Sequence, residues 1–151
     1  TKKKDLAGIA MSYGYVYVAH ISMGADMNQT VKALAEAEAY PGPSLIIAYA
    51  PCINHGIKKG MSKAMTEEQL AVECGYWNNF RYNPEAADKF TLDSKEPNLE
   101  AYKDFLNGEV RYNALMRANP EKAEVMFAQN EAEAKARYEY LKKLVTLHSA
   151  E

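Results

Sequence analysis

A strand–helix–strand pattern near the amino terminus constrains the fold of this chain more than any other feature. Residues 15–22, YVYVAHIS, are rich in β-branched and aromatic side chains, and residues 44–50, SLIIAYA, form a second run of this kind. Between them, Asp26 and Gln29 stand at the spacing of a helix capping box and precede apolar residues at helical spacing. The pattern predicts a βαβ unit with two parallel strands.

The second predicted strand is apolar on both of its faces. Such a strand is typical of a parallel sheet that is covered by helices on both sides. On the intervening helix, Val31, Leu34 and Ala35 form an apolar stripe. We therefore expect an α/β fold whose parallel strands end along one edge, where such folds build their sites. This edge would bring residues 20–24, HISMG, next to residues 50–56, APCINHG.

The middle of the chain is less regular. A helix is predicted that begins with a capping box formed by Thr66 and Gln69 and ends near Gly75. Residues 78–97 predict a long loop, with a short strand at residues 89–93.

After Pro97 we expect a helical region made of two helices. The first covers residues 98–118, and the second is capped by Asn119, has Pro120 at its first position and runs to about His148. The side chains expected to form the buried stripe of this second helix are Phe127, Ala134, Tyr138, Leu141 and Val145.

Composition restricts the function classes that need to be considered. The chain has 151 residues, 48% hydrophobic and 25% charged, which fits one globular domain. With a formal net charge of -2, the chain lacks the excess of basic residues typical of nucleic-acid-binding domains. No apolar run approaches the ~20 residues of a membrane span. Cys52 and Cys74 are the only cysteines, so no disulfide framework is expected and a cytoplasmic, reducing compartment is predicted.

Common enzyme motifs are absent from the sequence. It contains no GxGxxG, GxxxxGK[ST], GxSxG or HExxH pattern. The many carboxylates fall on predicted helix surfaces, and we interpret them as solvated side chains.

Cys52 is the one residue with several chemical interpretations. A free cysteine at the end of a strand is most often a small apolar side chain. It could instead bind zinc with His55 and Cys74, although zinc sites need four ligands. It could also be a nucleophile with His55 or His20 as its base. Spacing leaves these alternatives open and favours the first.

Three stretches of the chain closely resemble one enzyme family. They are residues 11–61, which include GPSLIIAYAPCINHG, residues 75–84, GYWNNFRYNP, and residues 90–97, FTLDSKEP. They resemble the C-terminal part of the pyruvate:ferredoxin (flavodoxin) oxidoreductases, and the resemblance runs from about Lys4 to Pro97.

The resemblance implies a partial three-layer thiamine diphosphate-binding fold. Residues 1–97 would be the C-terminal half of that α/β domain, and residues 98–151 a helical extension packed on it. The parent enzyme would decarboxylate pyruvate oxidatively on thiamine diphosphate and Mg²⁺ and transfer the acyl group to coenzyme A. Acetyl-CoA and CO₂ would be its products, and [4Fe–4S] clusters would pass its electrons to ferredoxin or flavodoxin.

The resemblance also assigns one site residue. The family's APCINHG-like turn supplies the fourth cysteine of a [4Fe–4S] cluster, which falls on Cys52, whereas the other three precede it in the parent. The family's Gly-Asp-Gly stretch and paired cysteines do not occur here, so we expect no catalytic or thiamine-binding residue in this chain.

The chain begins with Thr1 rather than Met, and we interpret it as an inactive fragment whose first partner is the rest of the parent chain. A truncated sheet would expose an edge strand and an apolar face, so a homo-oligomer is predicted. The alternatives are a non-catalytic α/β interaction domain and, more weakly, a zinc-binding module.

Overall fold

The computed structural model describes residues 4–150, and its centre is a four-stranded sheet in the order β2-β1-β3-β4. The strands are β1 (Tyr17–Ile21), β2 (Ser44–Ala48), β3 (Phe80–Tyr82) and β4 (Phe90–Leu92). β1 and β2 are parallel and are joined by α2 (Met27–Ala39), which confirms the predicted βαβ unit. β3 pairs antiparallel with both β1 and β4, so the sheet is mixed rather than wholly parallel.

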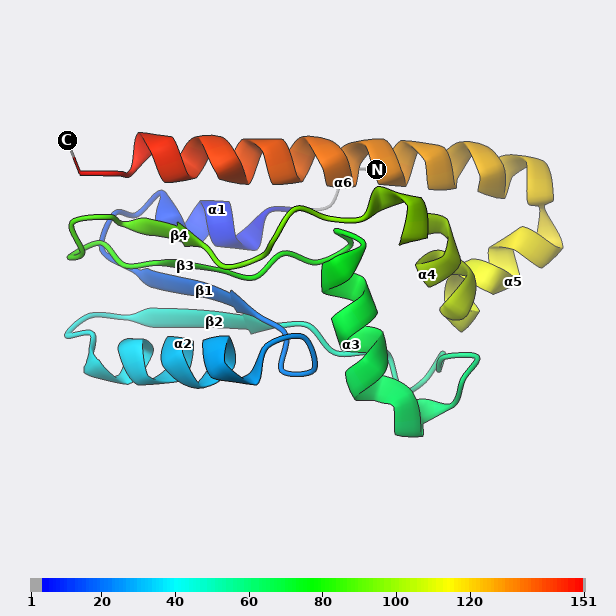
Figure 1. Cartoon of the computed structure of the whole chain (residues 1–151), viewed down its shortest axis with the longest axis horizontal. Coiled ribbons are helices and arrows are strands. Elements are labelled where there is room, and N and C mark those ends of the chain that lie inside the picture. Colours follow the sequence, from blue (N-terminus) through cyan, green and yellow to red (C-terminus); the bar gives the residue numbers. More distant parts are fainter. Residues whose placement is uncertain (1–3, 151) are drawn as a thin grey trace.

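Helices cover both faces of this sheet and give the molecule three layers (Figure 1). α2 lies on one face, and α1 (Leu6–Met11) and α6 (Pro120–Leu147) lie on the other. Alternate residues of β1 serve the two layers: Tyr17, Ala19 and Ile21 pack with α2, whereas Val18 belongs to the core under α1 and α6. The structure confirms an α/β fold followed by a helical C-terminal region.

β2 and α2 are more exposed than the sequence predicts. β2 is an edge strand whose residues are exposed or half-buried. Helices nevertheless lie on both of its faces as expected, because Leu45 and Ile47 pack on the side of α1 and Ile46 packs on the side of α2. On α2, Val31 is 60% and Leu34 51% exposed, so the apolar stripe faces outward. The side chains that α2 buries are Gln29, Thr30 and Ala33.

A network of polar side chains explains the orientation of α2. Arg81 on β3 donates to both oxygens of Asp93, at 2.9 and 2.8 Å, and to Glu36 of α2 at 2.6 Å. The Nε2 of Gln29 donates to Asp93 at 2.9 Å, and the hydroxyl of Tyr17 donates to Glu36 at 2.9 Å. Partly buried charges are stable when they are paired and hydrogen-bonded, so this network holds the polar side of α2 against the sheet.

α3 (Ala64–Glu73) begins earlier than the sequence predicts. It follows a 3₁₀ turn, η1 (Met61–Lys63), and starts two residues before Thr66, so the predicted Thr66–Gln69 capping box is wrong.

The predicted helix at residues 98–118 is interrupted. The structure has a 3₁₀ turn, η2 (Leu99–Ala101), then α4 (Tyr102–Gly108) and α5 (Val110–Ala118). Glu109 separates the two α-helices with an extended backbone at φ -82° and ψ 120°. Asn119 does cap α6, because its side chain accepts a hydrogen bond from the amide of Lys122, and Pro120 is the first residue of α6 as predicted.

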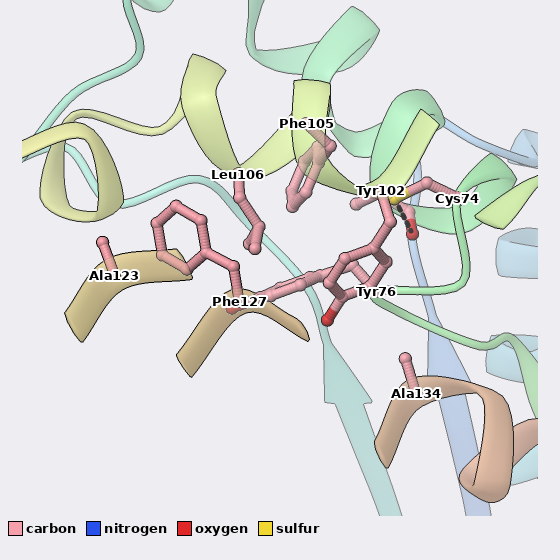
Figure 2. Close-up of a cluster of buried hydrophobic side chains, with 9 residues drawn as sticks. Cys74, Tyr76, Tyr102, Phe105, Leu106, Ala123, Phe127 and Ala134 are labelled. Atoms are coloured by element: carbon pink, nitrogen blue, oxygen red, sulfur yellow. Dashed lines mark hydrogen bonds between the residues drawn. The ribbon is translucent and has the colours of Figure 1, made fainter. Parts of the chain in front are cut away.

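A second hydrophobic core joins α3 to the C-terminal helices, and Figure 2 shows it. Tyr76, Tyr102, Phe105 and Phe127 meet in it with smaller side chains from α3, α4 and α6. Of the predicted α6 stripe, Val145 is 37% exposed, and Leu144 is buried in its place. No helix between residues 4 and 150 has the length and apolar character needed to cross a bilayer.

Candidate functional site

Cys52 lies in a closed turn directly beyond the parallel strands. Ile21 and Ala48 are partners in the register of β1 and β2, and the amide of Tyr49 donates to the carbonyl of Ile21 at 3.0 Å. Three residues later the chain turns, and the amide of Gly56 donates to the carbonyl of Cys52 at 2.8 Å. Gly56 has a φ of 76°, which favours glycine. The structure therefore places Cys52 at the carboxyl end of β2.

The C-terminal helices hold the end of this turn. Ile57 and Glu109 form an isolated antiparallel bridge. The amide of Lys58 donates to the carbonyl of Gly108 at 2.9 Å, and the amide of Val110 donates to the carbonyl of Gly56 at 3.2 Å. The break between α4 and α5 thus has a structural consequence, because the extended residue at the break pairs with the segment that follows Cys52.

Hydrogen bonds stabilise the thiolate form of Cys52. The backbone amide of His55, its side chain and the backbone amide of Asn54 all interact with the sulfur, in that order of effect, and lower the pKa of Cys52 to about 7. The Sγ of Cys52 lies 3.0 Å from Nδ1 of His55. The cysteine is half-buried, so its sulfur remains accessible from outside this chain.

Cys74 has the opposite environment. It follows the last residue of α3, is 1% exposed and belongs to the core that joins α3 to the C-terminal helices. Burial raises the pKa of Cys74 to about 11, and its thiol donates to the carbonyl of Ala71 at 3.6 Å. These properties are those of a structural cysteine, as expected from the sequence.

His20 is a half-buried strand residue packed against aromatic rings. Its ring stacks between those of Trp77 and Phe80, with centroids 4.4 Å from each. Burial lowers the pKa of His20 to about 4, so the imidazole is neutral near pH 7. Within the described part of the chain, no hydrogen bond joins it to Cys52. These contacts support the interpretation of His20 as a packed structural histidine. They do not support a role as the general base for Cys52.

The ligands of a zinc site do not come together. Among residues 4–150, no three His, Cys, Asp or Glu side chains are grouped to hold one metal ion, so Cys52, His55 and Cys74 do not form the predicted zinc module. An iron–sulfur cluster has a different requirement from the zinc module, because its four cysteine ligands can come from different segments of a protein. An accessible sulfur with a lowered pKa and amide donors fits one such ligand, and the others would have to come from outside the described residues.

Two buried carboxylates near the Cys52 turn were missed by sequence reasoning. Glu109 is 0% and Glu67 2% exposed, so their interpretation as solvated side chains is wrong. The burial of Glu67 had a signal in the sequence, since Ala71 and Cys74 follow it at i+4 and i+7 on α3. Glu109 had none, because its burial depends on the break between α4 and α5.

No family model matches the chain. The pyruvate-flavodoxin oxidoreductase of Enterobacter agglomerans is 57% identical over 150 residues, which cover 97% of the chain. The pyruvate:ferredoxin oxidoreductase of Moorella thermoacetica is 58% identical over 148 residues, or 95% of the chain. The resemblance to this enzyme family is confirmed.

The match covers a small part of these enzymes. The chain spans 13% of the length of the Enterobacter relative and 12% of that of the Moorella relative. A mitochondrial pyruvate dehydrogenase [NADP(+)] of Euglena gracilis is also similar, at 43% identity over 151 residues, and the chain spans 8% of it. The same segment thus occurs in pyruvate oxidoreductases named for flavodoxin, ferredoxin and NADP⁺.

Proposed function

We propose that the chain is the segment of a pyruvate:ferredoxin (flavodoxin) oxidoreductase that binds one iron of a [4Fe–4S] cluster through Cys52. The observation that carries this proposal is the turn at residues 52–56. Its sulfur is accessible, its pKa is lowered to about 7, and it lies at the carboxyl end of a parallel strand. The identity of 57–58% to enzymes of this family supports it.

When bound, a [4Fe–4S] cluster supplies one-electron transfer between the substrate-oxidising cofactor and an external acceptor. The residues of this chain would orient one ligand and adjust its electrostatics. The amides of Asn54 and His55 donate to the cysteine sulfur, and such donors tune the reduction potential of a cluster. The bridge between Ile57 and Glu109 would keep the turn in place.

We infer that the parent enzyme carries out the remaining chemistry outside this chain. It would oxidise pyruvate on thiamine diphosphate and Mg²⁺ and transfer the acyl group to coenzyme A. The electron acceptor would also be chosen elsewhere, because similar segments occur in enzymes named for three different acceptors. We propose a cytoplasmic location, which is supported by Cys52 and Cys74 being free thiols.

The test of this proposal is the iron and sulfide content of the full-length parent enzyme, purified without oxygen. A Cys52→Ala variant should lose one cluster, or about four irons and four sulfides per protomer. The matched control is Cys74→Ala, which removes the buried thiol of α3 and should retain the wild-type content.

Equal iron content in wild type, Cys52→Ala and Cys74→Ala would refute the ligand role of Cys52. That outcome would favour the alternative, an α/β interaction domain without this chemistry. Circular dichroism on each variant checks that iron is not lost through unfolding.

A further inference from the structure

A cavity in the described part of the chain has none of residues 52–56 in its wall. It has a volume of about 790 Å³, which is in the range of small-molecule sites. α3 and α4 form much of its wall, and the segment around residues 93–98 forms another part. The acidic side chains that line it are Asp26, Glu67, Glu73, Asp93, Glu96 and Asp104, against Lys59 and Lys95.

Several of these carboxylates already have partners. Asp93 binds Arg81 and Gln29, Asp26 caps α2, and Glu73 accepts a hydrogen bond from the Nε2 of Gln69 at 2.7 Å. Their presence in the wall is therefore explained by the fold.

Glu67 is different because its burial is not compensated. It is 2% exposed, and its Oε1 is buried with no hydrogen-bond partner in the structure of residues 4–150. No Lys, Arg or His side chain of the described residues lies within 4.0 Å of its oxygens to form an ion pair. A buried carboxylate without a partner is costly, and its partner is normally a cation or a donor.

The surroundings of Glu67 disfavour its ionised carboxylate unless a positive charge lies beside it. Burial and the negative field of Glu109 both raise the pKa of Glu67, and the field of Lys59 only partly opposes them. Glu109 is itself fully buried; within residues 4–150 it accepts a hydrogen bond from the hydroxyl of Tyr49 at 3.4 Å and forms one long ion pair, to Nε of Arg111 at 3.8 Å. Arg111 therefore serves Glu109, and Glu67 has no guanidinium or ammonium partner among the described residues.

Gly108 lies directly beside the carboxylate of Glu67. It also lines the cavity, and a Cβ at this position would lie 3.2 Å from Oε1 of Glu67. A side chain at residue 108 would occupy space next to the unpartnered oxygen. The glycine and the carboxylate together form an acidic recess at the wall of the cavity.

We propose that this cavity binds an organic cation, with a guanidinium or ammonium group paired to Glu67. A metal ion fits less well, because no three potential metal ligands are grouped among the described residues. Guanidinium and ammonium groups need only one carboxylate and neighbouring acceptors, and charge-assisted hydrogen bonds make such pairs strong. The source of the cation is either a free amine or an arginine or lysine of a neighbouring polypeptide. The site does not depend on the cluster role of Cys52.

Isothermal titration of the 151-residue chain with agmatine, which carries both a guanidinium and an ammonium group, tests the proposal. Binding to wild type should be saturable, and Glu67→Gln should weaken it by about tenfold or more, because it removes one charge-assisted pair. Glu73→Gln is the matched control: it neutralises a more exposed carboxylate of the same wall and should bind nearly as wild type does.

Amide chemical shifts of the wild-type chain give a second measurement that needs no variant. Agmatine should shift the amides of Lys59, Glu67 and Gly108 and leave those of the Cys52 turn near their free positions. Saturation by agmatine identifies a site for free amines. Binding only of an arginine-containing peptide, with the same shifts, assigns the cavity to a polypeptide side chain. No binding of either probe, or equal weakening by Glu67→Gln and Glu73→Gln, would overturn the proposal.

Discussion

At the scale of single residues, the conformation of the turn around Cys52 determines its chemistry more than the C-x-x-H spacing does. The C-x-x-H spacing raised the question of a metal ligand, but spacing left zinc, a nucleophile and a small apolar side chain all possible. The structure adds the two amides that face the sulfur and the contact with His55. These interactions depend on the turn closed by Gly56. The sequence shows a glycine there but does not by itself establish the positive φ.

Alkylation of the native 151-residue chain by iodoacetamide tests this environment. The thiolate is the reactive form, so the rate at Cys52 should rise with pH around a midpoint near 7, because the hydrogen bonds lower its pKa to about 7. Cys74, buried and with its pKa raised to about 11, should react only after unfolding. His55→Ala should move the midpoint upward, since one of the three interactions is lost.

A midpoint near the ordinary value for cysteine in wild type would contradict the described turn. Peptide mapping by mass spectrometry assigns the reaction to Cys52 or Cys74 and makes the two sites independent measurements.

At the scale of elements, the βαβ unit and its order were predictable, and the orientation of its helix was not. β1, α2 and β2 were predictable because side chains on one face recur every two residues in a strand and about every 3.6 residues in a helix. The outward rotation of α2 depends on Arg81, which lies 45 residues from its partner Glu36 in sequence. β3 was missed because it has three residues, and its pairing with β1 and β4 stabilises it.

The exposed stripe of α2 predicts how the isolated chain associates. Met27, Val31 and Leu34 are 50, 60 and 51% exposed and lie on one side of a helix next to the open edge strand β2. Sedimentation velocity should detect self-association of the 151-residue chain, and a Val31→Lys/Leu34→Lys double variant should weaken it by about tenfold or more, since it charges the apolar face.

The matched control for this experiment is Val125→Lys. Val125 is 69% exposed on α6, away from the stripe, and its substitution should leave association unchanged. A monomeric wild type at all concentrations would contradict the predicted homo-oligomer, and an unaltered dissociation constant in the double variant would exclude the α2 stripe as the contact.

At the scale of the whole molecule, the C-terminal helices and the Cys52 turn form one unit. α4 and α5 are joined at Glu109, which bridges to Ile57, and α6 packs over the sheet. The α/β class and the helical region were predictable from the sequence. The contact between them was not, because a helix that looks continuous from residue 98 to residue 118 is broken where it meets the turn. The boundary of the two proposed domains at Pro97 stays a prediction.

We propose that this chain supplies one of four cluster ligands in a longer enzyme. The most direct measurement is the genomic DNA sequence upstream of the codon for Thr1. We predict that the reading frame continues and encodes a Gly-Asp-Gly stretch together with a C-x-x-C pair and one further cysteine. A start codon immediately upstream would contradict this prediction, because the chain would then hold only one other cysteine, the buried Cys74, and could not supply the remaining three ligands.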